Sequence, residues 1–144
     1  MFEGISKAMN IYLRNALVII LSLAVGIGLI MLVQGIGHQI FKPPPGVSSG
    51  DPAAIKEYIE TAPLMALVMV PLSYLVGGIG AALCACRFSK GDNSTIAITG
   101  VILLALTIMT LADIAHPTWM AIANVLGSVL PIALGLYLAP RCRD

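Results

Sequence analysis

Asp113 and His116 are the polar pair whose residue types and spacing point most directly to chemistry. They lie three positions apart between two long apolar runs, and residues three apart can share a helical face. A carboxylate beside an imidazole can transfer protons or bind a metal, and His38 would complete a His-His-Asp set. The alternative is a solvated turn that caps the next helix. We expect the turn, and therefore no metal, cofactor or catalytic residue, with these three residues as the metal candidates.

Cys84, Cys86 and Cys142 could bring three thiolates together, as zinc and copper sites do. A Cys-x-Cys pair without a second pair is a weak metal motif, and cysteine also serves as a small apolar residue at helix ends. Three cysteines form no disulfide framework. The basic residues predict that all three lie on the cytoplasmic side, where thiols stay reduced. We therefore expect three free cysteines.

Polar side chains inside the apolar runs form the third group of candidates. Gln34 is near the end of the first run and Asn124 is about two turns into the fourth, so we expect both at a similar depth in the membrane. They could bond each other or line a small polar cavity, whose predicted residues are Gln34, Tyr74, Asn124 and Ser128. Hydrogen bonds between helices are the favoured interpretation, and a ligand site is the alternative.

Motifs of known enzymes are missing from the sequence, which has no serine elbow, HExxH, phosphate loop or haem-ligand pair. We therefore expect no enzyme activity. No Asp, Glu, Lys or Arg lies in the middle of an apolar run, where ion- and proton-coupled transporters usually place one. This absence makes a coupled transporter a poorer interpretation.

The composition is that of a membrane protein. Of 144 residues, 58% are hydrophobic and 10% are charged, and the mean hydropathy is +0.96. Soluble domains are about 45–50% apolar and about 25% charged. The net charge of +1 gives no argument for nucleic-acid binding. We expect the lipid bilayer to be the solvent of most of this surface.

Four apolar runs, at about 16–37, 63–86, 95–115 and 118–139, are each long enough to cross a hydrocarbon core of about 30 Å as a helix. They predict an all-α integral membrane four-helix bundle, with residues 1–144 as a single transmembrane domain. Residues 2–15 carry an apolar stripe at helical spacing, which predicts an N-terminal amphipathic helix. Asp51 followed by Pro52 predicts the start of a short interfacial helix between the first two spans.

Small residues recur at every fourth position in the second and fourth spans, and such stripes allow helices to approach closely in lipid. The predicted packing residues are Ser73, Gly77, Ala81, Ala123, Gly127, Pro131 and Gly135. They lead to the first functional hypothesis, a protein that acts by helix packing as a homo-oligomer or as an accessory subunit of a membrane complex. The alternatives are a transporter or channel for a small neutral or apolar solute, and a membrane enzyme or metal-binding protein at the outer face.

Basic residues predict the orientation. Six of the eight lie on the side of both termini and the middle loop, and only Lys42 and Lys56 lie on the other side. The positive-inside rule then places both termini in the cytoplasm of a multi-pass inner-membrane protein.

The chain also resembles a known group of proteins through three motifs. These are Pro43-Pro-Pro-Gly46, Asp51-Pro52 and Ile114-Ala-His-Pro-Thr-Trp119, with a glycine-rich second span between the last two. Over about residues 41–139 it resembles small, uncharacterised bacterial four-helix membrane proteins with a proline-rich outer loop and a His-Pro-x-Trp turn. Ala115 stands where those proteins often have proline. The resemblance implies four spans and a bacterial membrane, and it implies no activity.

Overall fold

The computed structural model describes residues 2–42, 44, 51–113 and 117–143. Its elements are α1 (Phe2–Ile40), α2 (Pro52–Thr61), α3 (Leu64–Phe88), α4 (Asn93–Asp113), α5 (Thr118–Leu138) and the 3-10 helix η1 (Ala139–Cys142). Helices α1, α3, α4 and α5 are long and apolar enough to cross a membrane. The described part of the chain contains no strand. The protein is thus an all-α, multi-pass membrane protein with four spans, as the sequence predicts.

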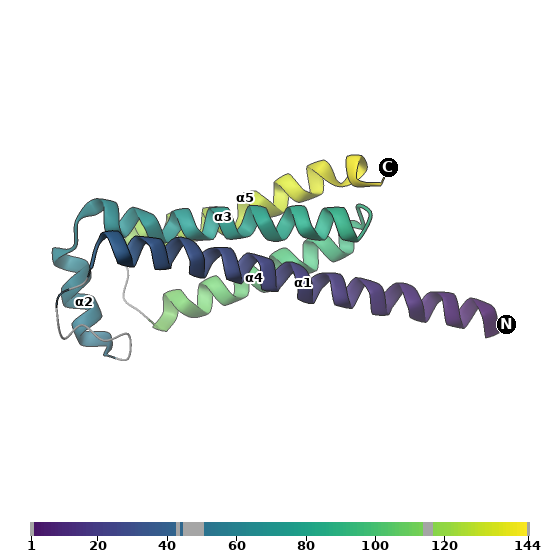
Figure 1. Ribbon diagram of the computed structural model, residues 1–144, viewed down its shortest axis with the longest axis horizontal. Helices are drawn as coiled ribbons and strands as arrows, with labels where there is room; N and C mark the ends of the chain where they lie inside the picture. Colours follow the sequence, from purple (N-terminus) through teal and green to yellow (C-terminus); the bar gives the residue numbers. More distant parts are fainter. Residues whose placement is uncertain (1, 43, 45–50, 114–116, 144) are drawn as a thin grey trace.

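Helix α1 joins the predicted amphipathic segment and the first span into one unbroken element of 39 residues. No glycine or proline lies between residues 5 and 25 to interrupt it. At 1.5 Å per residue the helix is roughly 58 Å long, almost twice the thickness of a hydrocarbon core. Its N-terminal part therefore projects beyond the other helices (Figure 1).

Helix α2 lies across one end of the bundle (Figure 1), which we call the α2 end. Asp51 caps it by accepting hydrogen bonds from the backbone N–H groups of Ala53 and Ala54, at 3.0 and 3.3 Å. This is the start predicted from Asp51-Pro52. The opposite end holds both chain termini and the turn between α3 and α4 (Figure 1). We call it the basic end, and the basic residues there whose side chains the structure describes are Arg14, Arg87, Lys90, Arg141 and Arg143.

Helix α3 is the centre of the bundle and contacts α1, α4 and α5. On its α1 side, a Cβ added to Gly77 would lie 2.6 Å from the carbonyl oxygen of Gly26. On its α5 side, a Cβ added to Gly78 would lie 2.7 Å from Pro131 Cγ. A real Cβ does not tolerate such distances, so glycine permits the close approach of both neighbours.

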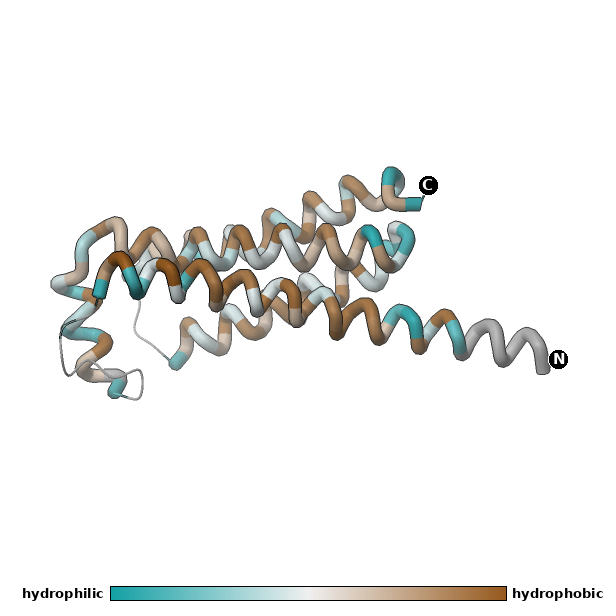
Figure 2. The backbone as a smooth tube through the Cα atoms, viewed as in Figure 1, coloured by the Kyte–Doolittle hydropathy of each residue, from teal (hydrophilic) through white to brown (hydrophobic). Residues whose placement is uncertain are grey.

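The exterior is apolar, and the interior contains small polar residues beside apolar ones, unlike a soluble bundle. Figure 2 shows hydrophobic residues along the helices and hydrophilic residues gathered mainly near the two ends. Large apolar side chains such as Ile20, Met31 and Leu130 are more than half exposed. The buried polar residues are Ser22, Ser73, Ser89, Thr95, Thr99, Thr107, Asn124 and Ser128. Lipid is the solvent that suits such a surface.

A disulfide between Cys86 and Cys142 closes the basic end, and it corrects the expectation of three free cysteines. Helix η1 turns the chain back over the end of α3, which brings the two Cα atoms to 5.8 Å. This is within the range of disulfides. The two residues are 56 positions apart, so the sequence alone did not reveal the pair. Cys84 remains free and half-buried.

Candidate binding cavity inside the bundle

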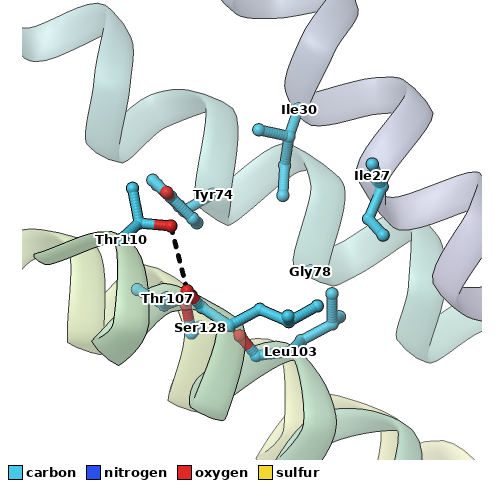
Figure 3. A pocket seen from close by; sticks show the side chains of 9 residues that line it. Ile27, Ile30, Tyr74, Gly78, Leu103, Thr107, Thr110 and Ser128 are labelled. Atoms are coloured by element: carbon cyan, nitrogen blue, oxygen red, sulfur yellow. Dashed lines mark hydrogen bonds between the residues drawn. The ribbon is translucent and has the colours of Figure 1, made fainter. Parts of the chain in front are cut away.

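A cavity of about 230 Å³ lies among the four spanning helices. Figure 3 shows side chains from all four pointing toward this common space. Helix α1 contributes Ile27 and Ile30, α3 contributes Tyr74 and Gly78, α4 contributes Leu103, Leu106, Thr107 and Thr110, and α5 contributes Ser128. The lining is thus mainly apolar, with a small number of hydroxyl groups.

The course of α4 leaves this space open. Near the basic end α4 lies against α1, where the side-chain amide of Asn15 donates to a carboxylate oxygen of Asp92 at 3.4 Å. Toward the α2 end the two helices diverge (Figure 1). Ile27 and Leu106, on the two sides of the gap, are 40% and 41% exposed. Both of these cavity-lining residues are therefore also exposed on the outside of the bundle.

Thr107 and Ser128 are the buried polar pair of the cavity, with their hydroxyl oxygens 2.8 Å apart. Thr107 also lies 2.9 Å from the carbonyl oxygen of Leu103, and Ser128 lies 3.1 Å from that of Asn124. Two hydroxyl hydrogens thus serve three contacts, and none is left over for another acceptor. What the pair presents to the cavity is oxygen lone pairs, so it favours a molecule that carries its own O–H or N–H group.

Two further hydroxyls complete the polar lining. Thr110 donates to the carbonyl oxygen of Leu106 at 3.0 Å and so also presents an acceptor. The phenol of Tyr74 takes part in no hydrogen bond among the described residues, which leaves its O–H available as a donor. None of the lining residues is a carboxylate or a basic group. The cavity therefore suits a neutral molecule, because a charge would lose its hydration without gaining a partner.

The predicted cavity residues divide into two sets. Tyr74 and Ser128 line the cavity, whereas Gln34 and Asn124 do not. Gln34 instead donates to the hydroxyl of Ser73 at 3.1 Å and joins α1 to α3 near the α2 end. Asn124 is 1% exposed, and its side-chain oxygen is buried with no hydrogen-bond partner in the described part of the chain. Gln34 and Asn124 are thus not partners of each other.

The metal candidates do not form a site in the described part of the chain. His38 is exposed near the end of α1, and Asp113 is exposed at the end of α4. His116 lies outside the described residues. Among the described His, Cys, Asp and Glu residues, no group of three gathers closely enough to hold a metal ion.

The inner face of α4 was not among the predicted site residues. Thr95, Thr99 and Thr107 are each 1% exposed and follow one helical face toward the cavity. Their spacing of four and eight residues was the available signal, because it places all three on one side of the helix. Threonine in membrane helices commonly donates a hydrogen bond to a carbonyl oxygen of its own helix, so the row of three threonines alone did not indicate a cavity.

Asp92 caps α4 at the basic end. Its carboxylate accepts from the hydroxyl of Thr95 at 2.6 Å and from the backbone N–H of Thr95 at 2.9 Å. The hydrogen bond from the Thr95 hydroxyl lowers the pKa of Asp92 below its ordinary value, and burial opposes this shift in part. The hydrogen bond from the Thr95 backbone and the nearby positive charges of Arg14 and Arg143 lower the pKa further. The carboxylate thus stays ionised at the start of α4, where a negative charge is favourable.

The predicted packing residues lie mainly at helix–helix interfaces within one chain, which we call seams. Gly77 and Ala81 contact α1, and Gly127 contacts the backbone of α3, where a Cβ would lie 3.2 Å from the carbonyl oxygen of Pro71. A Cβ on Gly135 would lie 3.1 Å from the Cβ of Ala82. Pro131 and Ser73 are buried, and Ala123 is half-buried.

No family model, curated protein or solved structure matches this chain.

Proposed function

We propose that the protein binds a small neutral molecule inside the membrane and carries it between the bilayer and the bundle interior. The observation that supports this most strongly is the cavity at membrane depth, whose buried hydroxyl pair, Thr107 and Ser128, lies within a mainly apolar lining. Polar groups within a membrane are costly, and those without a purely structural role commonly mark a solute site. We therefore propose binding or transport of a neutral solute as the first function and assembly with other helices as the second.

The size of the cavity restricts the solute. An apolar cavity of about 150 Å³ holds benzene, and pockets for drug-sized ligands begin at about 300 Å³. At about 230 Å³ this cavity fits a molecule larger than benzene, or one arm of a larger lipid-soluble molecule. The hydroxyl pair adds a preference for a donor. A small alcohol or phenol with an apolar body combines these properties.

Photolabelling tests this proposal. The probe is an eight-carbon alcohol that carries a diazirine, added to the protein in lipid nanodiscs, and labelled peptides are identified by mass spectrometry. We expect label on the peptides that contain Tyr74 and Thr107, and competition by unlabelled octanol. Leu106→Phe should reduce this labelling, because Leu106 lines the cavity. The control is Met109→Phe on the lipid side of α4, where Met109 is 63% exposed. Equal labelling of both variants and of the wild type would contradict the proposal.

Assembly through α1 is a second candidate function, and it continues the hypothesis of an oligomer or accessory subunit. A Cβ on Gly28 or Gly35 would meet no atom within 4 Å, so these glycines are free to approach another helix. The stripes on α3 and α5 are already used inside the chain. If the protein assembles, Gly28→Leu should lower the mass of the complex in mild detergent, measured by light scattering. A wild type that is monomeric at all concentrations would exclude self-assembly.

We also propose a bacterial inner-membrane location with both termini in the cytoplasm. The support is the gathering of basic residues at the end that holds both termini, together with the sequence resemblance. The Cys86–Cys142 disulfide favours the opposite orientation, because disulfides are rare in the cytoplasm. Reporter fusions at residues 48 and 91, with a reporter that is active only outside the cytoplasm, decide between the two orientations. We expect activity for the fusion at residue 48 and none for the fusion at residue 91, and the reverse result would overturn the proposed orientation.

A further inference from the structure

A second, smaller void of about 10 Å³ continues the cavity toward the basic end. The two voids share Gly78, Leu103 and Ser128 as lining residues. From there the lining of the smaller void moves toward the basic end on α3, α4 and α5, for example to Thr99 and Ile132. The cavity and the void thus follow one line through the interior of the bundle.

Leu103 separates the two voids. It is the only shared lining residue with a large side chain, and it is 7% exposed. Its Cδ1 lies 3.6 Å from the position that a Cβ would take on Gly26, so the side chain reaches from α4 across the interior to α1. Leu103 is therefore the large side chain of this separation whose movement could join the two voids.

The smaller void has the properties of a site for one water molecule. Its volume of about 10 Å³ is near the lower limit for holding a water. Thr99 lines it, is 1% exposed and donates its hydroxyl hydrogen to the carbonyl oxygen of Thr95 at 2.8 Å. A lone pair of the Thr99 hydroxyl then remains to accept a hydrogen bond from a water or another small donor.

We propose that Leu103 is a gate that controls the passage of water-sized neutral molecules from the cavity to Thr99. An apolar side chain at a constriction excludes water while it fills the gap, and it admits water when it moves aside. The inference rests on the proposed function, since the cavity is the compartment from which such a molecule arrives. Beyond Thr99 the cluster of Ala85, Ile96 and Ala139 closes the basic end.

The test measures how fast hydrogen peroxide, a neutral molecule little larger than water, oxidises the thiol of a cysteine at position 99 to the sulfenic acid. The background is the Cys84→Ser protein, in which the Cys86–Cys142 disulfide is kept. Thr99→Cys should react slowly while Leu103 is present, because a thiol must be hydrated to form the reactive thiolate. Leu103→Ala should raise the rate several-fold. The matched control is Val101→Ala, since Val101 is 61% exposed on the same helix and lines neither void.

Equal rates for the Leu103→Ala and Val101→Ala proteins would overturn the gate. If Leu103→Ala does not yield a folded protein, Leu103→Val makes a smaller opening and should give a smaller increase, and no increase would equally overturn it. Thr107→Cys reports on the cavity alone, because Thr107 lines only the larger void. A reactive Thr107→Cys with an unresponsive Thr99→Cys would reject the gate and leave the binding proposal intact. An unreactive Thr107→Cys would reject the binding proposal itself.

Discussion

Helix α3 meets α1 and α5 in one way, and the part of α4 beside the cavity meets α5 in another. At the first two seams glycines bring backbones together, so that a single added Cβ on Gly77 or Gly78 has no room. At the cavity, α4 presents Thr107 to Ser128 and leaves open space beside it. Glycine seams fix the frame of the molecule, whereas the hydroxyl seam holds its helices together and still leaves a volume that a ligand can fill.

Gly77→Leu should have the largest effect on stability. A Cβ there would lie 2.6 Å from the carbonyl oxygen of Gly26, so α1 and α3 must separate. We expect a loss of about 3 kcal/mol or more in the free energy of unfolding, as overpacking with backbone displacement gives. Thermal unfolding in mild detergent measures it. Gly28→Leu on the open side of α1 is the control, and it should unfold like the wild type if the protein is a monomer.

Removal of the cap at the basic end should have a smaller effect. Asp92→Ala deprives the Thr95 hydroxyl and backbone N–H of their acceptor, and such caps contribute about 0.5–2 kcal/mol. The same measurement applies, with Asp113→Ala at the exposed end of α4 as the control. A cap variant as stable as the control would show that Asp92 does not help to hold α4 in place.

The stability that Asp92 provides should also depend on pH. Because folding lowers the pKa of Asp92 below 3.8, its contribution is fully present above that value. It is lost as the pH falls through the lower pKa of the folded state. Asp92→Asn keeps a capping oxygen but cannot ionise, so its stability should fall less than that of the wild type between about pH 5 and pH 2. Parallel curves for the two proteins would contradict this assignment.

The smallest effect is expected at the hydroxyl pair. Hydrogen bonds between membrane helices contribute about 0.6 kcal/mol on average, so Thr107→Val and Ser128→Ala should each destabilise only slightly. The double variant should cost less than the sum of the two, because removal of both partners leaves neither unsatisfied. A double-mutant cycle measures the coupling. If these variants lost as much free energy of unfolding as Gly77→Leu, the hydroxyl contact would be as important for stability as the glycine contacts, which would contradict the account.

Much of the frame could be predicted from the sequence, because hydropathy and length determine which segments cross a membrane. The run predicted at 63–86 is α3, Leu64–Phe88, and that at 118–139 is α5, Thr118–Leu138. The unbroken α1 and the Cys86–Cys142 pair were not predicted. To predict the unbroken α1, one would need to know that the helix continues in a straight course outside the membrane. To predict the disulfide, one would need to know that η1 turns back over the end of α3.

The cavity was predicted only in part, because its lining depends on how each helix is rotated about its axis. Depth along the chain suggested that Gln34 and Asn124 lie together, but Gln34 faces Ser73 on α3. Tyr74 and Ser128 were among the expected residues, whereas Thr107 and Thr110 were not. Sequence spacing assigns residues to one face of a helix, and it does not say which neighbour that face meets.

The reactivity of a cysteine at position 107 tests the central claim, a solvent- and ligand-accessible cavity among the membrane-spanning helices, most directly. In the Cys84→Ser background, methyl methanethiosulfonate should modify Thr107→Cys quickly, and octanol should slow the reaction. Ile108→Cys, at the same depth, should react slowly because Ile108 is 52% exposed to lipid. Equal slow rates at both positions, unaffected by octanol, would show that the space beside Thr107 is dry and closed.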